Sequence, residues 1–273
     1  MHPELRQPAT QDWDHFFRLA VTEGWCIPST EQEMFGDQWR DHARVTALDG
    51  TFAGMVTAVP HETSGWIGNL IIPSELRRQG LGTQLFTAAC AALEQHGCQS
   101  IWLTASTQGQ PLYASFGFRV VDHIHRWIHP GREGHRSKKK SERNNGERLA
   151  ELDRQAWGEK RNVMLNGLMN HGEVLVTEDA VALLQRGPDF QVIGPWYSPN
   201  LCPRSNRLLL QEALDEHPAP SFVADLLASS PVAQLLAAAG FRKAGENALM
   251  VRGTDAAVNR SMMVSLASLG SFG

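Results

Sequence analysis

The sequence predicts an α/β fold (α+β by some schemes) that occurs twice along the chain, each time with helices around a mixed sheet. Helical and β-strand patterns alternate along the first 128 residues, and a similar order returns after residue 149. The two halves also share a local similarity, YASFGFRV from Tyr113 and LAAAGFRK from Leu236. With 273 residues, the chain has room for two domains at about 150 residues each. We therefore expect two copies of one fold, the second diverged.

The individual elements follow from periodicity and turn signals. In the first half, helices are expected at 13–25, 81–96 and 111–116, a hairpin at 44–59 around an Asp-Gly turn, and strands at 66–72, 100–105 and 118–127. In the second half, helices are expected at 149–169, 207–216 and 231–239, and strands at 173–179, 180–185, 191–197, 221–227 and 246–251.

A charged segment separates the halves. Between Arg132 and Arg143, six Lys or Arg oppose two Glu, and the surrounding residues offer nothing to bury. We expect a solvated, flexible hinge, which is favoured over a tether for nucleic acid or an anionic surface. The expected boundaries are a first domain at 1–128, the basic linker at 129–148, a second domain at 149–254 and a tail at 255–273.

Composition excludes several classes of protein. The net charge of -4 argues against a surface built to neutralise nucleic-acid phosphates. The N-terminal residues do not resemble a signal peptide, and the most apolar stretch, 222–239, is interrupted by Asp225 and Pro231, so no membrane partner is expected. The four cysteines stand far apart, which is typical of reduced, mostly buried thiols in a cytoplasmic protein: Cys26, Cys90, Cys98 and Cys202.

The most informative motif is a glycine-containing loop between a predicted strand and a predicted helix. Its residues are Arg77, Arg78, Gln79, Gly80, Leu81, Gly82 and Thr83. Glycines allow the backbone to turn sharply and to approach a ligand closely, and free N–H groups at a helix N-terminus attract anions. The third glycine of a dinucleotide-binding fingerprint and the GK[ST] of a triphosphate loop are both missing. The loop therefore predicts a seat for a pyrophosphate.

This loop resembles the R/Q-x-x-G-x-G/A motif of the GCN5-related N-acetyltransferases (GNAT), with Arg77, Gly80 and Gly82 at the motif positions. The segment PLYASFGF also resembles that family, because Tyr113 precedes a Gly-Phe pair by four residues. The finer resemblance, through the LTASTQGQPLY and LAELDRQAWGEKR segments, is to two-domain acetyltransferases of the YitH type, whose second domain is degenerate. The sequence departs from the family pattern at two points. Pro73 stands directly beside Ile72, one residue earlier than the proline that many members have after this strand. The asparagine that is frequent before the tyrosine segment is absent, and Gln108 lies in that neighbourhood.

The resemblance implies tandem GNAT folds, each with a mostly antiparallel central sheet, and acetyl-CoA as co-substrate with no metal. Tyr113 would be catalytic, protonating the departing thiolate. Backbone groups of Leu70, Ile71 and Ile72 would pair with the pantetheine arm, and the loop from Arg77 to Thr83 would hold the pyrophosphate. Gln108, Tyr113 and Phe116 complete the expected cofactor-binding set.

No residue is singled out as the base that takes the acceptor's proton. Glu23, His61 and Glu62 are candidates, although each is favoured as a surface residue. His123 and His125 share a strand face and could bind a metal. The favoured interpretation is that these two histidines and His129 belong to a partly exposed strand edge and bind no metal.

The second half lacks the features of the first. Leu236 stands where Tyr113 stands in the first half, and no glycine occurs between Pro195 and Ala239. This half is therefore expected neither to seat a pyrophosphate nor to protonate a thiolate, but to wall the acceptor pocket. Candidates to line that wall are Trp157, Arg161, Trp196 and Tyr197, with core packing favoured for the two tryptophans.

Three functions stay open. The leading hypothesis is transfer of an acetyl group from acetyl-CoA to a small-molecule amine by direct attack in a ternary complex. The rivals are a non-catalytic acyl-CoA sensor or interaction protein, and a protein or peptide N-acetyltransferase. The acceptor is not identified, and the protein is expected to be a monomer or a homodimer.

Overall fold

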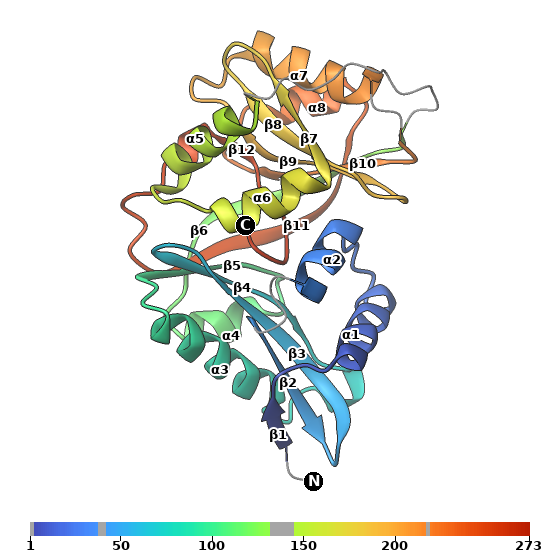
Figure 1. Cartoon of the computed structure of the whole chain (residues 1–273), viewed down its shortest axis with the longest axis vertical. Coiled ribbons are helices and arrows are strands. Elements are labelled where there is room, and N and C mark those ends of the chain that lie inside the picture. Colours follow the sequence, from blue (N-terminus) through green and yellow to red (C-terminus); the bar gives the residue numbers. More distant parts are fainter. Residues whose placement is uncertain (1–2, 38–41, 132–144, 217–218) are drawn as a thin grey trace.

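The computed structural model describes residues 3–37, 42–131, 145–216 and 219–273 (Figure 1). The elements of the first half are β1 (Pro3–Arg6), α1 (Thr10–Thr22), α2 (Ser29–Asp37), β2 (Ala43–Leu48), β3 (Thr51–Pro60), β4 (Ser64–Ile71), η2 (Ser74–Leu76), α3 (Leu81–Gln95), β5 (Ser100–Ala105), α4 (Gln110–Ser115) and β6 (Arg119–His129). Those of the second half are α5 (Asn145–Trp157), α6 (Asn162–Asn170), β7 (Gly172–Val176), β8 (Val181–Gln185), β9 (Gln191–Tyr197), α7 (Pro203–Glu216), β10 (Phe222–Leu227), α8 (Ala233–Ala238), β11 (Arg242–Gly253), η3 (Arg260–Met262) and β12 (Met263–Ser265).

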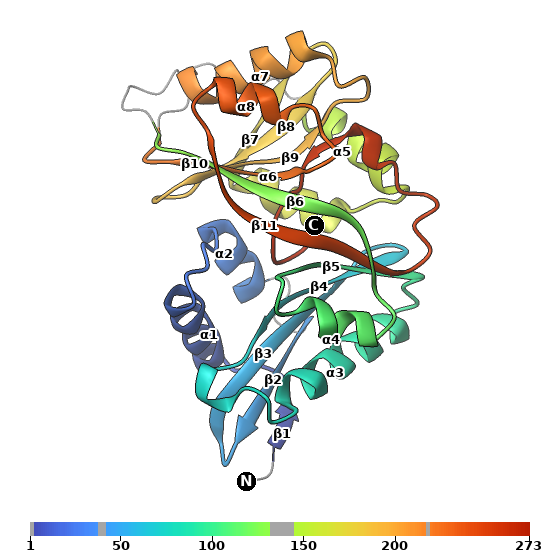
Figure 2. The same ribbon diagram turned by 180° about the vertical axis from the view of Figure 1, so that it is seen from behind.

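The strands of both halves join into one sheet, in the order β1-β2-β3-β4-β5-β11-β6-β10-β12-β9-β8-β7. The pairs β4–β5 and β9–β10 are parallel, and the other pairs in this sheet are antiparallel. Helices cover both faces of the sheet (Figures 1 and 2). The mixed, mostly antiparallel α/β architecture expected from the sequence is confirmed.

Three groups of buried side chains hold the helices to the sheet. One core lies on a single face and joins α1 and α2 to α5 and α6, through residues such as Trp13, Phe35, Leu149 and Met164. On the other face, α3 packs through Leu85 and its neighbours, and α7 and α8 pack over the second half. The first core therefore crosses from one half to the other, so the halves are not separated by solvent.

The two halves exchange a strand. β11, from the end of the chain, lies between β5 and β6, with Leu249 opposite Thr104 and Ala248 opposite His123. β6, from the first half, also pairs with β10, with Arg126 opposite Asp225. Figure 2 shows both strands running between the halves. No pattern in the sequence indicates this exchange, because a strand's own residues do not specify which neighbour it pairs with.

The helix expected at 149–169 is wrong as a continuous element, since it divides into α5 and α6. Gly158 between them has a φ of +74°, and a Cβ there would lie 2.6 Å from Cβ of Ala257. The next residue, Glu159, turns its carboxylate to the β3–β4 turn, where it accepts from the N–H groups of Thr63 (2.6 Å) and Ser64 (3.0 Å). A glycine in the left-handed region and a buried carboxylate contact thus end α5.

Several segments extend beyond the sequence-based expectations. Strands β1 and β12, and helix α2, were not predicted. The segment expected as a linker contributes His129 to β6 and residues 145–148 to the first turn of α5, and residues 132–144 of it lie outside the described part of the chain.

Of the four cysteines, all free, Cys90 alone is buried and Cys26 is exposed, so the expectation of mostly buried thiols is wrong.

The histidines of β6 do not lie at a sheet edge, contrary to the expectation, because β10 and β11 pair with this strand on its two sides. His125 Nε2 lies 3.2 Å from Glu246 Oε2, and His129 packs against Phe241 and Phe222. In the described ranges no three His, Cys, Asp or Glu side chains come together as a metal site would require. Nor does any described helix have the length and apolar character to cross a bilayer.

The strand exchange predicts that neither half folds alone. A fragment of residues 1–131 would leave β5 and β6 without β11, and their unpaired backbone groups would stay exposed. We expect this fragment to show no cooperative denaturant transition by circular dichroism. Mixing it with a fragment of residues 145–273 should restore a cooperative transition. A cooperative transition of fragment 1–131 by itself would contradict the exchange.

Candidate active site

The loop between β4 and α3 turns back on itself through two residues in the left-handed region. Arg78 has a φ of +62° and Gly80, the N-cap of α3, a φ of +85°. The N–H of Gln84 donates to Gly80 O (3.0 Å), which begins the helical ladder, so the N–H groups of the preceding turn have no partner within the helix. The loop therefore presents a row of donors at the positive end of the α3 dipole.

The Arg77 side chain anchors the loop to the end of β4 and to the end of α1. Its Nε donates to Ile72 O (3.0 Å), and its Nη2 lies 2.6 Å from Glu23 Oε1, at the end of α1. These contacts hold the end of β4 and the start of the loop together.

A cavity of about 640 Å3, here called the loop cavity, opens beside this loop. The residues expected from the sequence that line it are Leu70, Ile71, Ile72, Arg77, Arg78, Gly80, Gly82, Thr83, Gln108 and Tyr113. Three expected residues do not line it. Gln79 donates to Glu75 O (3.4 Å), Leu81 is buried, and the ring of Phe116 packs against Phe86 with centroids 4.9 Å apart.

The loop cavity lies where β4 and β5 part. These parallel strands pair from Ser64 opposite Ser100 to Trp66 opposite Trp102, and pairing ends there although both strands continue. Strands that diverge leave a wedge-shaped opening with backbone groups on both sides. Leu70, Ile71 and Ile72 stand on the β4 side of this opening and line the loop cavity.

The C-terminal segment enters the vertex of this opening. The N–H of Asn69 donates to Gly270 O (3.2 Å), and the hydroxyl of Thr104 on β5 donates to Leu269 O. Gly68 allows the approach, because a Cβ at that position would lie 1.9 Å from Gly270 O. The tail thus occupies the opening as far as Asn69, and the strand edge beyond it faces the loop cavity.

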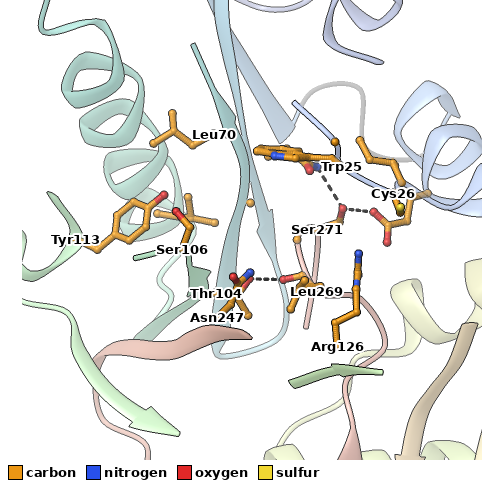
Figure 3. Close-up of a pocket in the computed structure, with 17 residues that line it drawn as sticks. Trp25, Cys26, Leu70, Thr104, Ser106, Tyr113, Arg126, Asn247, Leu269 and Ser271 are labelled. Carbon is orange, nitrogen blue, oxygen red and sulfur yellow. Dashed lines mark hydrogen bonds between the residues drawn. The ribbon is translucent and has the colours of Figure 1, made fainter. Parts of the chain in front are cut away.

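A second cavity, of about 320 Å3 and here called the inner cavity, lies on the side of α1 and α2 (Figure 3). The two cavities share Trp25, Leu70, Ser106 and Tyr113. Residues 269–271 of the tail form part of the inner wall. Tyr113 therefore stands at the junction of a cavity beside the glycine loop and a cavity bounded by both halves.

Tyr113 is held rigidly at this junction. Its ring packs 4.8 Å from the ring of Phe86 and 6.5 Å from that of Phe118, measured between centroids, and its N–H donates to Gly109 O (3.2 Å). Burial raises the pKa of the Tyr113 phenol to about 12. The hydroxyl is therefore neutral at pH 7 and can act as a proton donor.

The end of the inner cavity away from Tyr113 carries charged groups. Arg126 on β6 donates from Nε and Nη2 to the two carboxylate oxygens of Asp225 on β10, both at 2.8 Å. Glu31 on α2 accepts from the hydroxyls of Ser268 (2.6 Å) and Ser271. Burial raises the pKa of Glu31 to about 7, although the two serine hydroxyls act in the opposite direction.

The corresponding opening in the second half is filled. β9 and β10 pair in parallel only through Gln191 with Phe222 and Val192 with Val223. β12 pairs with both strands, with Ser265 opposite Trp196 on β9 and Leu226 on β10. The strand edges that line a cavity in the first half are thus already paired here.

Comparisons with known proteins match both halves to one family. The model of the acetyltransferase (GNAT) family matches residues 9–118, and a model of an acetyltransferase (GNAT) domain matches residues 149–264. Together the two matches span most of the chain. The protein belongs to the GNAT superfamily. Its tandem arrangement of two GNAT domains agrees with the expectation from the sequence.

Solved structures agree with this assignment at the level of the fold. A Pyrococcus horikoshii protein provisionally assigned as an acetyltransferase aligns with a TM-score of 0.83 and 18% identity, over 98% of this chain and 95% of that one. A GNAT protein from Sphaerobacter thermophilus aligns with a TM-score of 0.67 and 15% identity, over 94% and 98%. One from Anabaena variabilis gives 0.58 and 12%, over 99% and 84%. No match was found among curated proteins.

Not every candidate base lies near the two cavities of this GNAT protein. Glu23 lines the loop cavity, where it pairs with Arg77. His61 and Glu62 lie at the β3–β4 turn and line neither cavity. There, Glu62 accepts from the N–H of Lys160 (2.9 Å), so it contacts the second half.

The residues expected to wall the acceptor pocket line neither cavity. Arg161 donates to both carboxylate oxygens of Asp153 (2.6 and 3.1 Å), and the Tyr197 hydroxyl donates to Asp153 Oδ1 (2.6 Å). The indole of Trp157 stacks under Arg161 at 4.2 Å and donates to the Tyr197 hydroxyl (3.2 Å). Trp196 is fully buried. The wall assignment of Arg161 and Tyr197 is wrong, because their polar groups satisfy one another in the core.

The second half instead contributes Asn247 and tail residues 269–271 to the lining of the inner cavity. It also contributes Asp225, the ion-pair partner of Arg126. These residues, together with Trp25 and Glu31, were missed at the level of the sequence. Trp25 is the last residue of the predicted first helix and Cys26 follows it directly, so the place of these two residues near the site could have been inferred. Glu31 lies on α2, a helix that the sequence did not predict, and the residues of the second half are brought in by the strand exchange, for which the sequence offers no signal.

The two tyrosines of the chain, Tyr113 and Tyr197, lead to a prediction about alkaline pH. Burial raises both pKa values, that of Tyr113 to about 12, whereas in an unfolded chain both lie near 10. Between those values the native state holds protons that the unfolded state has lost, so the free energy of unfolding should fall as pH rises through this range.

The measurement is a tyrosinate absorbance titration. We expect little tyrosinate below about pH 11 in the folded protein, and ordinary titration near pH 10 in denaturant. A folded-state transition near pH 10 would contradict the buried, neutral phenols.

Proposed function

We propose that this protein transfers an acetyl group from acetyl-CoA to the amine of a small-molecule acceptor, by direct attack in a ternary complex. The observation that carries the proposal is the position of Tyr113, which lines both the loop cavity and the inner cavity. A donor in the loop cavity and an acceptor in the inner cavity could then both reach this phenol. Membership of the GNAT superfamily supports acyl transfer as the reaction class.

The donor side follows from the loop cavity. The free N–H groups from Arg78 to Thr83 would hold the pyrophosphate of acetyl-CoA, with added charge from the Arg78 guanidinium. Leu70, Ile71 and Ile72 would pair with the pantetheine arm through backbone groups, as an added strand does. Gln108 and Gly109 lie across the same cavity, and the proposed chemistry uses no metal.

The acceptor nitrogen, an ammonium at pH 7, must lose two protons, one before attack and one after it has bonded to carbon, and the departing thiolate must gain one. The amine nitrogen forms a bond to the thioester carbonyl carbon, and the carbon–sulfur bond breaks as the intermediate collapses. Tyr113 gives its phenolic proton to the departing sulfur and regains one from solvent. An ordinary ammonium has a pKa near 10.4, so the acceptor must lose a proton before attack.

The inner cavity favours a small acceptor over a peptide. Its volume is about 320 Å3, and the tail closes the wall between α2 and β5 through Glu31, Ser271 and Thr104. A protein substrate would need an open groove to admit its backbone. Assays should therefore begin with free amines.

The direct test is a thiol-release assay across a panel of small amines, together with calorimetry of acetyl-CoA binding. We expect binding and amine-dependent thiol release. Binding of acetyl-CoA without release on any amine would replace the proposal with a non-catalytic acyl-CoA-binding protein. Release only with peptides would indicate a protein or peptide acetyltransferase.

Gly82→Leu tests the phosphate seat. The substitution places a leucine side chain in the loop cavity, which Gly82 lines, beside the backbone N–H groups of the loop. The Cβ of the new residue would lie 3.8 Å from Ile72 Cγ1, which is an ordinary van der Waals contact. Loss of charge-assisted hydrogen bonds should weaken acetyl-CoA binding about tenfold or more by calorimetry. Thr87→Leu, an exposed position on the same helix that does not line the cavity, is the control and should bind normally. Equal affinity in both variants would refute the seat.

Tyr113→Phe tests the proton donor. The variant keeps the ring contacts with Phe86 and Phe118 and removes only the hydroxyl. Turnover in the thiol-release assay should fall about 100-fold, in the range of general acid catalysis, while acetyl-CoA affinity changes little. Unchanged turnover would remove Tyr113 from its proposed role.

A further inference from the structure

The inner cavity has two chemically different ends. Figure 3 shows Tyr113 and Ser106 at one end and Arg126, Ser271 and Cys26 at the other, with Trp25 above the space between them. Glu31 belongs to the second end, because its carboxylate accepts from Ser271. An acceptor whose amine faces Tyr113 would place its other end among these groups.

The charges at this second end do not cancel. Arg126 and Asp225 neutralise each other through a two-point pair in which Asp225 is buried. Glu31 is also buried, at 3% exposure, and within the described chain no ion pair joins it to a cation. Its partners are two serine hydroxyls, which donate hydrogen bonds without supplying charge. A buried carboxylate of this kind is costly unless a positive group compensates it.

We infer that the acceptor carries a second cationic amine, which binds beside Glu31 while its first amine faces Tyr113. This inference rests on the proposed function and names its substrate class, that of diamines and polyamines. Arg126, the cation near Glu31 in this lining, is paired with Asp225, so a ligand ammonium would supply the ion-pair partner that Glu31 lacks among the described residues. A ligand carboxylate at the same place would lie beside the Glu31 carboxylate, and the one guanidinium that lines this end, that of Arg126, is already paired with Asp225.

The burial of Glu31 agrees with this assignment. Desolvation raises its pKa to about 7, which is the response of a carboxyl group that lacks sufficient compensating charge. Arg126 lowers that pKa and Asp225 raises it, so their effects oppose each other. Glu31 also anchors the tail through Ser268 and Ser271, but anchoring alone predicts no preference among ligands.

The first experiment compares three probes on the wild-type protein in the thiol-release assay. Cadaverine has two amines, n-pentylamine has one, and the matching ω-aminocarboxylate carries a carboxylate in place of the second amine. We expect kcat/KM for cadaverine to exceed that for n-pentylamine about tenfold or more, with the aminocarboxylate lowest. Equal values for the first two probes, or a preference for the aminocarboxylate, would overturn the inference and leave the acetyltransferase proposal intact.

The second experiment uses Glu31→Gln, in which the amide oxygen can still accept from a serine hydroxyl. The ratio of kcat/KM for cadaverine to that for n-pentylamine should fall to about one in this variant, because the second ammonium loses its ion-pair partner. Glu33→Gln is the matched control, since Glu33 lies on the same helix, is exposed and lines neither cavity. It should keep the preference, and a preference that survives in Glu31→Gln would overturn the inference.

Failure of the acetyltransferase proposal is recognised separately, by absence of thiol release with every amine. In that case the same three probes are measured by calorimetry on the wild-type protein. Selective binding of cadaverine would support the Glu31 site, and binding without discrimination, or none, would overturn it.

Discussion

The parting of β4 from β5 is the constraint on which the site depends. Two parallel strands that stop pairing expose backbone donors and acceptors, and buried groups of this kind need partners. Near the vertex the C-terminal segment supplies a partner, because the N–H of Asn69 donates to Gly270 O, and the side-chain hydroxyl of Thr104 donates to Leu269 O. Farther along, Leu70, Ile71 and Ile72 face a cavity that ends at the glycine loop. The loop cavity and the inner cavity both lie beside this wedge, and Tyr113, which follows β5, lines both.

The two sides of the site are built differently. The loop cavity is lined by residues of the first half, from Glu23 to Tyr113. The inner cavity combines α2, the exchanged strands β6 and β11, and the tail. In the second half, β12 occupies the opening between β9 and β10. The repeated fold therefore has one open wedge with a glycine loop beside it, while the inner cavity is assembled from both halves.

The sequence predicted the lining of the loop cavity better than that of the inner cavity, for a physical reason. The glycine loop is seven consecutive residues, and Tyr113 has a fixed spacing to Gly117 and Phe118, so local patterns were enough. Glu31, Arg126 and Ser271 are far apart in the chain, and only the strand exchange brings them together. The same limit explains the errors. Arg161 and Tyr197 looked available for a pocket wall because their shared partner, Asp153, had no recognisable signal.

The exchange of β6 and β11 also bears on the history of the chain. After a gene duplication, a copy that has lost its ligand is ordinarily free to erode or to be deleted. Here β11 lies between β5 and β6, inside the sheet that positions Thr104 and Tyr113. A change in the second half that displaces β11 would therefore also disturb the strands beside the cavities of the first half, so the two halves cannot change independently.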